Sequence, residues 1–200
     1  MQTTVYAFEG IVPVIDPTAW VHPSAVLIGD VIVGPGCYVG PGAVLRGDFG
    51  RIVMQPNTNL QDNCVVHSAP DFDCVMEEEC HIGHGAVIHC ARIGRDALIG
   101  IHAVIMDTAV VGEQAVVAAK SFVKVADVVP PRVLVAGVPA RVRRALSDDD
   151  IAWKRRGTAL YIELVRRSLD GGITATKPLE RVEEGRGRTR WDFVSVREKS

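Results

Sequence analysis

The chain has 200 residues, 48% of them hydrophobic and 23% charged, which leaves room for one globular domain with a short appendage. Its formal net charge of −2 argues against nucleic acid as a partner. No run approaches the roughly 18–20 apolar residues of a membrane span, and the first residues lack the pattern of a signal peptide. The five cysteines include no CxxC pair, so we do not expect a disulfide framework. We expect a cytoplasmic protein.

An aliphatic residue returns every six positions, beginning at Ile15, Val21 and Leu27 and continuing with interruptions to Val123. A small residue usually follows four positions later. A period of six matches neither an amphipathic helix nor a half-buried strand. It is typical of a hexapeptide β-helix, in which each hexad supplies a short strand and a corner, and three hexads close one coil. We therefore predict a mainly β fold, with a parallel β-helix over residues 1–146.

The small inward positions of this repeat include Cys37, Cys64 and Cys80. Free cysteine behaves as a small apolar residue in a core, so we interpret these three side chains as packing groups.

The segment after the repeat opens with Ser147 and three aspartates, which is a typical helix N-terminus. Apolar residues then recur at helical spacing as far as a Gly-Gly pair, which is a helix stop. The apolar positions are Ile151, Leu160, Tyr161, Leu164, Val165 and Leu169. We predict a helix over residues 147–170 packed on the β-helix, and a charged C-terminal extension over 171–200.

Four of the six histidines lie within 23 residues of one another, from His67 to His89. With three hexads per coil, Leu45 stacks under Val66, and Val66 stacks under Ile88. The residues that follow these three aliphatics therefore project outward in one column on consecutive coils. These residues are Arg46, His67 and His89. Two imidazoles one coil apart can share a metal ion.

His84 belongs to the preceding face, so it does not easily reach the same point in its own chain. In a homotrimer, one subunit's face meets the neighbouring face of the next, and His84 then completes a three-histidine site. Three protein ligands with a fourth position open for water are the pattern of catalytic zinc. His81 falls outside the column and is left out of this site. The alternative is that these histidines are incidental surface residues.

Three motifs of this chain resemble those of the γ-class carbonic anhydrase-like family of left-handed β-helix trimers. They are Leu45–Asp48, then Gln61–Asn63 followed by Val66-His67, and Ile82–Ala86 followed by Ile88-His89. The segment Ala136–Arg141 resembles the motif that closes the β-helix. The resemblance implies left-handed coils, a homotrimer, and His67, His84 and His89 as metal ligands.

A finer likeness is carried by the segments Val26–Ile32, Leu45–Ile52, Ala152–Lys154 and Gly157–Thr158, with Tyr161 shortly after. Within that family these segments resemble the PaaY type of phenylacetate degradation, with the carnitine-operon type near it. This likeness implies a thioesterase that hydrolyses acyl-CoA thioesters through metal-bound hydroxide at the interfacial three-histidine site. The supporting catalytic residues it implies are Arg46, Asp48 and Gln61, with Tyr161 as a further candidate. We expect the metal to be zinc, with iron or cobalt as alternatives, because imidazole ligands suit several metals.

One residue departs from the pattern of the carbonic anhydrases, and this departure bears on the choice of reaction. Carbonic anhydrases of this class resemble one another in an acidic residue, which transfers protons, at the position that Phe49 occupies here. Carbon dioxide hydration therefore stays an alternative to thioester hydrolysis. A hexapeptide acyltransferase and a non-enzymatic accessory protein are two further alternatives. The Arg46 and Asp48 pair has its own second interpretation, as a salt bridge at a subunit interface.

Overall fold

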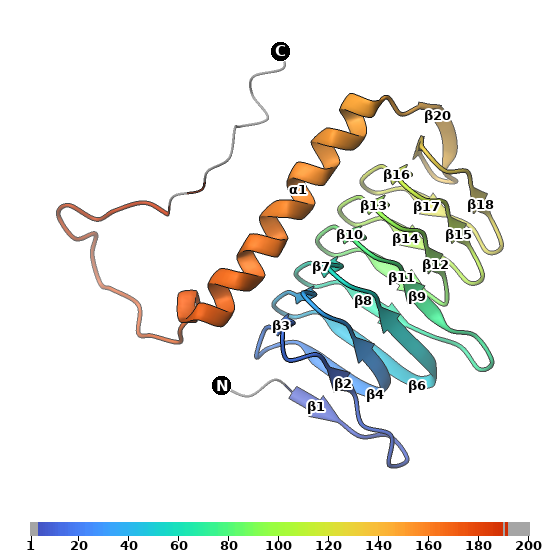
Figure 1. Cartoon of the computed structure of the whole chain (residues 1–200). Helices are drawn as coiled ribbons and strands as arrows, with labels where there is room; N and C mark the ends of the chain where they lie inside the picture. Colours follow the sequence, from blue (N-terminus) through green and yellow to red (C-terminus); the bar gives the residue numbers. More distant parts are fainter. Residues whose placement is uncertain (1–3, 190, 192–200) are drawn as a thin grey trace.

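The computed structural model describes residues 4–189 and 191, and its strands wind into a parallel β-helix with three faces (Figure 1). Strands one coil apart pair in parallel, and the chain visits the three faces in turn. The predicted mainly β fold with three hexads per coil is confirmed. The left-handed sense of the coils, which the resemblance implies, stays a prediction.

The first face carries the predicted column of histidines and is called the histidine face. Two long strands, β4 and β6, turn a corner, so each contributes its first half to this face and its second half to another. The strands of the histidine face are β1 (Thr4–Tyr6), β4 (Val26–Val33), β6 (Val44–Met54), β8 (Val65–His67), β11 (Val87–His89), β14 (Val104–Ile105) and β17 (Phe122–Val123).

The second face lies against the C-terminal helix and is called the helix face. Its strands are β3 (Trp20–Val21), β5 (Tyr38–Val39), β7 (Asn59–Leu60), β10 (His81–Ile82), β13 (Leu98–Ile99), β16 (Val116–Val117), β19 (Val133–Ala136) and the antiparallel β20 (Arg141–Ala145). The third face contains β2 (Val14–Ile15), β9 (Cys74–Met76), β12 (Arg92–Ile93), β15 (Val110–Val111) and β18 (Val128–Val129).

The core is the narrow interior of the coils, filled by the inward residues of the repeat. Leu45, Val66 and Ile88 are fully buried and stack on one another, as the six-residue period predicts. The cysteines at the small inward positions are also fully buried, and all five cysteines are free. Their burial agrees with the interpretation of Cys37, Cys64 and Cys80 as packing groups.

The C-terminal helix α1 (Asp148–Arg167) begins at Ser147 and ends in a single π-helical turn, η1 (Ser168–Gly172). The Ser147 hydroxyl accepts a hydrogen bond from the backbone N–H of Asp150, whose carboxylate accepts one from the Ser147 N–H. This capping box fixes the start of the helix. From there α1 runs back along the helix face toward the first coils (Figure 1).

The face that α1 buries is only partly the predicted apolar stripe. Ile151 and Val165 are buried as expected, but Lys154 and Thr158 are buried between them, and Leu169 points outward with 49% exposure. Lys154 takes an inward position because the buried carboxylate of Asp96 lies opposite. No helix in the described part of the chain is both long enough and apolar enough to span a membrane.

The charged extension begins after Gly172. Residues 173–189 form neither a helix nor a strand. Residues 190 and 192–200 of the predicted extension lie outside the described residues.

Candidate functional site

The predicted column on the histidine face is present. Arg46 in β6 pairs with His67 in β8, and His67 pairs with His89 in β11, so the three residues occupy the same register position on consecutive coils. All three follow a buried aliphatic residue, and side chains alternate between the two sides of a strand. Their side chains therefore point outward together.

The side chains of this column contact one another. His67 Nδ1 lies 3.1 Å from His89 Nε2, and the two rings are tilted with centroids 5.1 Å apart. On its other side, His67 Nε2 lies 3.1 Å from Asp48 Oδ1. Arg46 Nη1 donates to the second oxygen of the same carboxylate at 2.6 Å. Asp48 thus connects the arginine to the histidines.

Asp48 keeps its charge in this position. Burial alone would raise its pKa, but the hydrogen bonds from Arg46 and His67 outweigh that effect and hold the pKa below the ordinary value for aspartate. The carboxylate accordingly fixes the ring of His67 and presents a permanent negative charge beside it. A carboxylate against one ring nitrogen is the usual way to orient a metal-binding histidine.

His89 has a carboxylate neighbour of its own. Asp107 Oδ1 lies 3.0 Å from His89 Nδ1. His89 Nδ1 is nevertheless a buried nitrogen that makes no hydrogen bond with the described residues.

The residues of this column fit a shared metal ion. Two nitrogens that each bind zinc at ~2.0–2.1 Å in tetrahedral geometry lie about 3.4 Å apart. The 3.1 Å between His67 and His89 is close to that value.

Phe49 borders the column. Its ring centroid lies 5.4 Å from that of His67, and Arg46 Cζ lies 5.9 Å from the Phe49 ring. The side chain is 59% exposed. An apolar ring thus stands beside the histidines at the position where the sequence resemblance implies an acidic proton carrier in carbonic anhydrases.

His84 lies apart from this column, at the corner between the helix face and the histidine face. Its Nδ1 is 3.0 Å from Asp62 Oδ2, and both side chains are more than two-fifths exposed. The described residues of one chain contain no group of three or more His, Cys, Asp or Glu side chains that could hold a metal. A three-histidine site with His84 therefore needs a second chain.

Gln61, His84 and Tyr161 line one cavity together with His81. This cavity has a volume of about 420 Å³, and apolar residues such as Leu98 and Ile101 complete its wall. Gln61 and Tyr161 are thus brought to His84, and they are not brought to the histidine column of their own chain. Burial raises the pKa of the Tyr161 hydroxyl above its ordinary value, so this group is a phenol and not a phenolate.

His81 is the member of this cavity that the sequence reasoning left out. Its Nε2 lies 2.6 Å from Gln61 Nε2, and Tyr161 packs on its ring edge to face with centroids 5.3 Å apart. Burial, followed by the charges of Lys154 and His84, lowers the pKa of His81 to about 4. The signal in the sequence was its register: His81 stacks on Asn59, two residues before Gln61.

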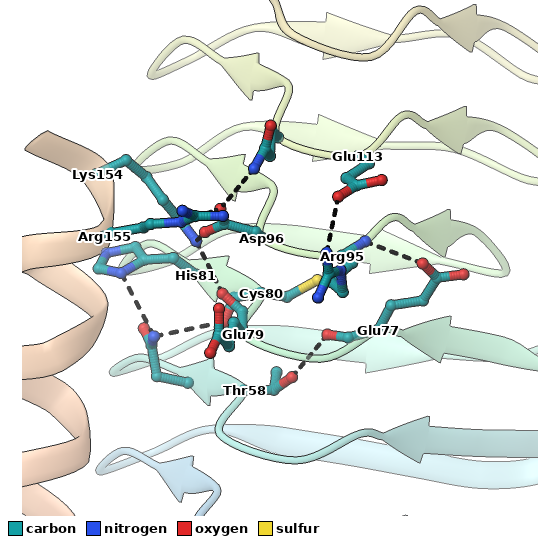
Figure 2. Close-up of polar contacts among 12 residues, drawn as sticks. Thr58, Glu77, Glu79, Cys80, His81, Arg95, Asp96, Glu113, Lys154 and Arg155 are labelled. Atoms are coloured by element: carbon teal, nitrogen blue, oxygen red, sulfur yellow. Dashed lines mark hydrogen bonds and ion pairs between the residues drawn. The ribbon is translucent and has the colours of Figure 1, made fainter. Parts of the chain in front are cut away.

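A buried ion pair holds the helix over this cavity. Lys154 Nζ contacts Asp96 Oδ1 and donates to the carbonyl oxygen of Glu79 at 2.8 Å, and Arg155 Nε donates to Asp96 Oδ2 at 2.8 Å (Figure 2). The side chains of Lys154 and Asp96 are 3% and 1% exposed. Figure 2 shows His81 beside this pair, between α1 and the coils.

Comparison with known proteins agrees with the repeat and the fold. The family profile described as "Bacterial transferase hexapeptide (six repeats)" matches residues 13–47. The carnitine operon protein CaiE of Escherichia coli O157:H7 is 54% identical over 183 residues, covering 92% of this chain and 93% of that protein. CaiE of Salmonella agona is 52% identical with 92% coverage of each.

Solved structures show the same architecture. A hexapeptide transferase family protein from Anaplasma phagocytophilum superposes with a TM-score of 0.79 at 34% identity, covering 83% of this chain and 98% of that chain. A provisionally assigned acetyltransferase from Bacillus cereus superposes with a TM-score of 0.83 at 30% identity, with 85% and 99% coverage. The chain therefore belongs to the hexapeptide-repeat family that includes the carnitine operon proteins CaiE.

Proposed function

We propose that this protein is a homotrimeric, metal-dependent thioesterase that hydrolyses acyl-CoA thioesters at three subunit interfaces. The observation that carries the proposal is the division of the predicted site into two halves. Arg46, Asp48, His67 and His89 lie together on the histidine face, whereas Gln61, His84 and Tyr161 lie around the corner cavity. Neither half holds three histidines, and each supplies what the other lacks.

The surface around the histidine column supports the trimer. Phe49 and Val65 on this side of the coil are 59% and 42% exposed, and Ile101 at the corner cavity is 47% exposed. Large apolar side chains on both halves are suited to contact with a second copy of the chain.

Each residue of the two halves has a proposed role in the reaction. His67 and His89 of one subunit and His84 of the next would hold the metal, with Asp48 orienting His67 and Arg46 fixing Asp48. When bound, the metal supplies Lewis-acid activation of water near neutral pH. Gln61 would orient the attacking water, and the Tyr161 hydroxyl would donate a hydrogen bond within the cavity.

The overall reaction is the hydrolysis of a thioester. The water oxygen forms a bond to the carbonyl carbon, the carbon–sulfur bond breaks, and the CoA sulfur leaves as the thiol after taking up a proton. The products are a carboxylic acid and free CoA. One water is consumed in each cycle.

Phe49 favours this reaction over carbon dioxide hydration. A fast hydratase releases a proton to buffer in every cycle, and an apolar ring beside His67 cannot carry it. The same ring offers a surface to an aromatic or aliphatic acyl group. Phenylacetyl-CoA is therefore one candidate substrate, and a CoA thioester of carnitine is another because the CaiE relatives are carnitine operon proteins.

The cysteines support a cytoplasmic location for this activity. All five are free and buried, which is usual in a reducing compartment.

A hexapeptide acyltransferase is the second candidate, because the Anaplasma hexapeptide transferase family protein shares both the fold and 34% of the aligned residues. The two reactions differ in the acceptor of the acyl group: water in a thioesterase and an amine or alcohol in a transferase. They also differ in their need for a three-histidine metal site.

The test is an assay of CoA release from phenylacetyl-CoA, acetyl-CoA and a carnitine CoA thioester. Zinc-, cobalt- and iron-loaded protein is compared with metal-stripped protein, and carbon dioxide hydration is measured on the same preparations. We expect thioester hydrolysis that is lost on metal removal and restored on reloading. Hydrolysis that is unchanged in stripped protein, or fast hydration without hydrolysis, would contradict the proposal. CoA release only when an amine or alcohol acceptor is added would identify an acyltransferase.

A further inference from the structure

His81 occupies a half-buried position that the proposed metal site leaves unexplained. It lies at the start of β10, directly above Asn59 of β7, and α1 covers it with Tyr161. Gly157 of the same helix passes over the ring, and a Cβ atom at that position would lie 3.7 Å from His81 Cε1. The ring is thus enclosed between one coil and the helix.

The amide of Gln61 is held from two sides in this enclosure. Its Nε2 donates one hydrogen bond to Asn59 Oδ1 at 3.0 Å. The same nitrogen lies 2.6 Å from His81 Nε2. This second contact takes the other hydrogen of the Gln61 amide. The described residues offer no donor to Gln61 Oε1. The carbonyl end of the amide is therefore the end available to a molecule in the cavity.

This arrangement requires one form of the His81 ring. A neutral imidazole accepts a hydrogen bond at one nitrogen only and carries its proton on the other. The 2.6 Å contact at Nε2 is much shorter than the 3.4 Å between His81 Nδ1 and Asn59 Nδ2. The accepting nitrogen is therefore Nε2, and Nδ1 carries the proton. The low pKa of about 4 keeps the ring neutral at physiological pH.

We infer that His81 is a positioning residue, which holds the Gln61 amide nitrogen through Nε2 so that Gln61 Oε1 accepts a hydrogen bond from the attacking water. This inference rests on the proposed function, because the water is the nucleophile of that reaction. The cavity that receives the carbonyl end also contains His84, the ligand that one subunit would supply to its neighbour's histidine column.

A purely structural role for His81 predicts different effects of substitution than a positioning role does. If the ring only fills space under Tyr161, any flat side chain of similar size preserves its function. If Nε2 is required as an acceptor, a side chain with an acceptor at the same distance from the backbone preserves function without the ring. His81→Phe keeps the ring and removes the acceptor, whereas His81→Gln keeps an acceptor oxygen near the place of Nε2.

The experiment measures kcat and KM for acyl-CoA hydrolysis on the metal-loaded wild type, His81→Phe and His81→Gln. Metal content and oligomeric state are recorded for each protein. His22→Asn is the matched control, because His22 is a turn histidine on the helix face whose Nδ1 contacts Ser24, away from the cavity. We expect kcat of His81→Phe to fall roughly 10- to 100-fold with KM and metal content unchanged. We expect His81→Gln to recover most of that loss and His22→Asn to equal the wild type.

Equal loss in the Phe and Gln variants, or full activity in His81→Phe, would overturn the inference. A second measurement is independent of turnover: the ¹⁵N chemical shifts of His81 in labelled protein. We expect an unprotonated Nε2 and a protonated Nδ1. A proton on Nε2 would reverse the Gln61 amide and overturn the inference even in an active enzyme. A wild type without hydrolysis would contradict the proposed function, and the ring spectrum would still decide how Gln61 is held.

Discussion

The histidine face and the helix face give an outward-facing histidine opposite surroundings. His67 and His81 both lie on short strands that pair along the coils, and both contact a residue one coil away. On the histidine face the neighbours of His67 carry charge: Asp48 contacts its ring, and Arg46 binds the same carboxylate. On the helix face the neighbours of His81 are neutral amides and an aromatic ring, because α1 covers the strand.

The difference indicates that the cover over a strand decides the surroundings of an outward histidine. The β-helix places outward side chains in columns at fixed spacing on all three faces. His81, under the chain's own helix, contacts an amide and an aromatic ring, with the buried ion pair of Lys154 and Asp96 nearby. A column that no part of the described chain covers keeps charged partners and, in our proposal, meets another subunit.

Substitution of a ligand should abolish activity on the uncovered face. We expect His67→Ala, His84→Ala and His89→Ala each to reduce hydrolysis to the background rate. Loss of a residue that hydrogen-bonds to a metal ligand weakens metal binding roughly 10- to 100-fold. We expect loss of a ligand itself to weaken metal binding more than that. Metal content and CoA release on the same preparations measure this. Stoichiometric metal in any of the three variants would remove that residue from the site.

Breaking the buried ion pair between Lys154 and Asp96 should weaken the packing of α1 on the helix face. Asp96→Asn leaves the Lys154 ammonium buried without its countercharge, so we expect a loss of about 3–5 kcal/mol in the free energy of unfolding. Urea denaturation measures it. Glu113→Gln is the control, because it removes the exposed Arg95 pair and should leave stability unchanged. An Asp96→Asn variant as stable as the control would show that the pair does not hold α1.

The covered histidine should make the fold sensitive to acid. The unfolded chain protonates His81 near its ordinary pKa of 6.5, whereas the folded chain does so only at about 4. The stability is therefore complete above pH 6.5 and falls as the pH drops toward 4, by about 3 kcal/mol. The charged and titratable groups that face the ring are Lys154, His84 and the Tyr161 phenol.

His81→Phe should lose this dependence between pH 6.5 and 4, and His22→Asn should keep it. Denaturation of metal-free protein across this range measures the effect. An unchanged slope in His81→Phe would show that the ring titrates as in the unfolded chain.

The smallest expected effect lies at the start of the helix. Ser147→Ala removes the side-chain oxygen that caps α1, and we expect a loss of about 1 kcal/mol. Ser147→Asp, which retains a capping oxygen, should be close to the wild type. A loss as large as that of Asp96→Asn would mean that the cap, and not the ion pair, controls docking.

The repeat made most of the fold predictable, because a period of six dictates both the buried residue and the coil register. The pairing of Leu45, Val66 and Ile88 follows from counting hexads, and with it the column of His67 and His89. The N-terminal cap at Ser147 was also predictable, because it depends only on neighbouring residues in the sequence.

The cluster around His81 was not predictable in the same way. Counting places His81 above Asn59, but it does not say which face the helix covers or that Tyr161 reaches the ring. Lys154 was missed for a related reason: apolar periodicity has no means of showing that a lysine is buried against an aspartate 58 residues earlier. Such pairs depend on tertiary contacts between distant segments.

The division of the site between subunits is the central claim, and mixed trimers test it most directly. His67→Ala and His84→Ala chains are co-expressed with different affinity tags and purified through both tags. The account predicts that metal binding and hydrolysis return in the mixed protein, because an intact histidine column then meets an intact His84. The matched pair, His67→Ala with His89→Ala, should stay inactive, because neither chain then has a complete column. Mixed trimers of the first pair without metal or activity would contradict the account.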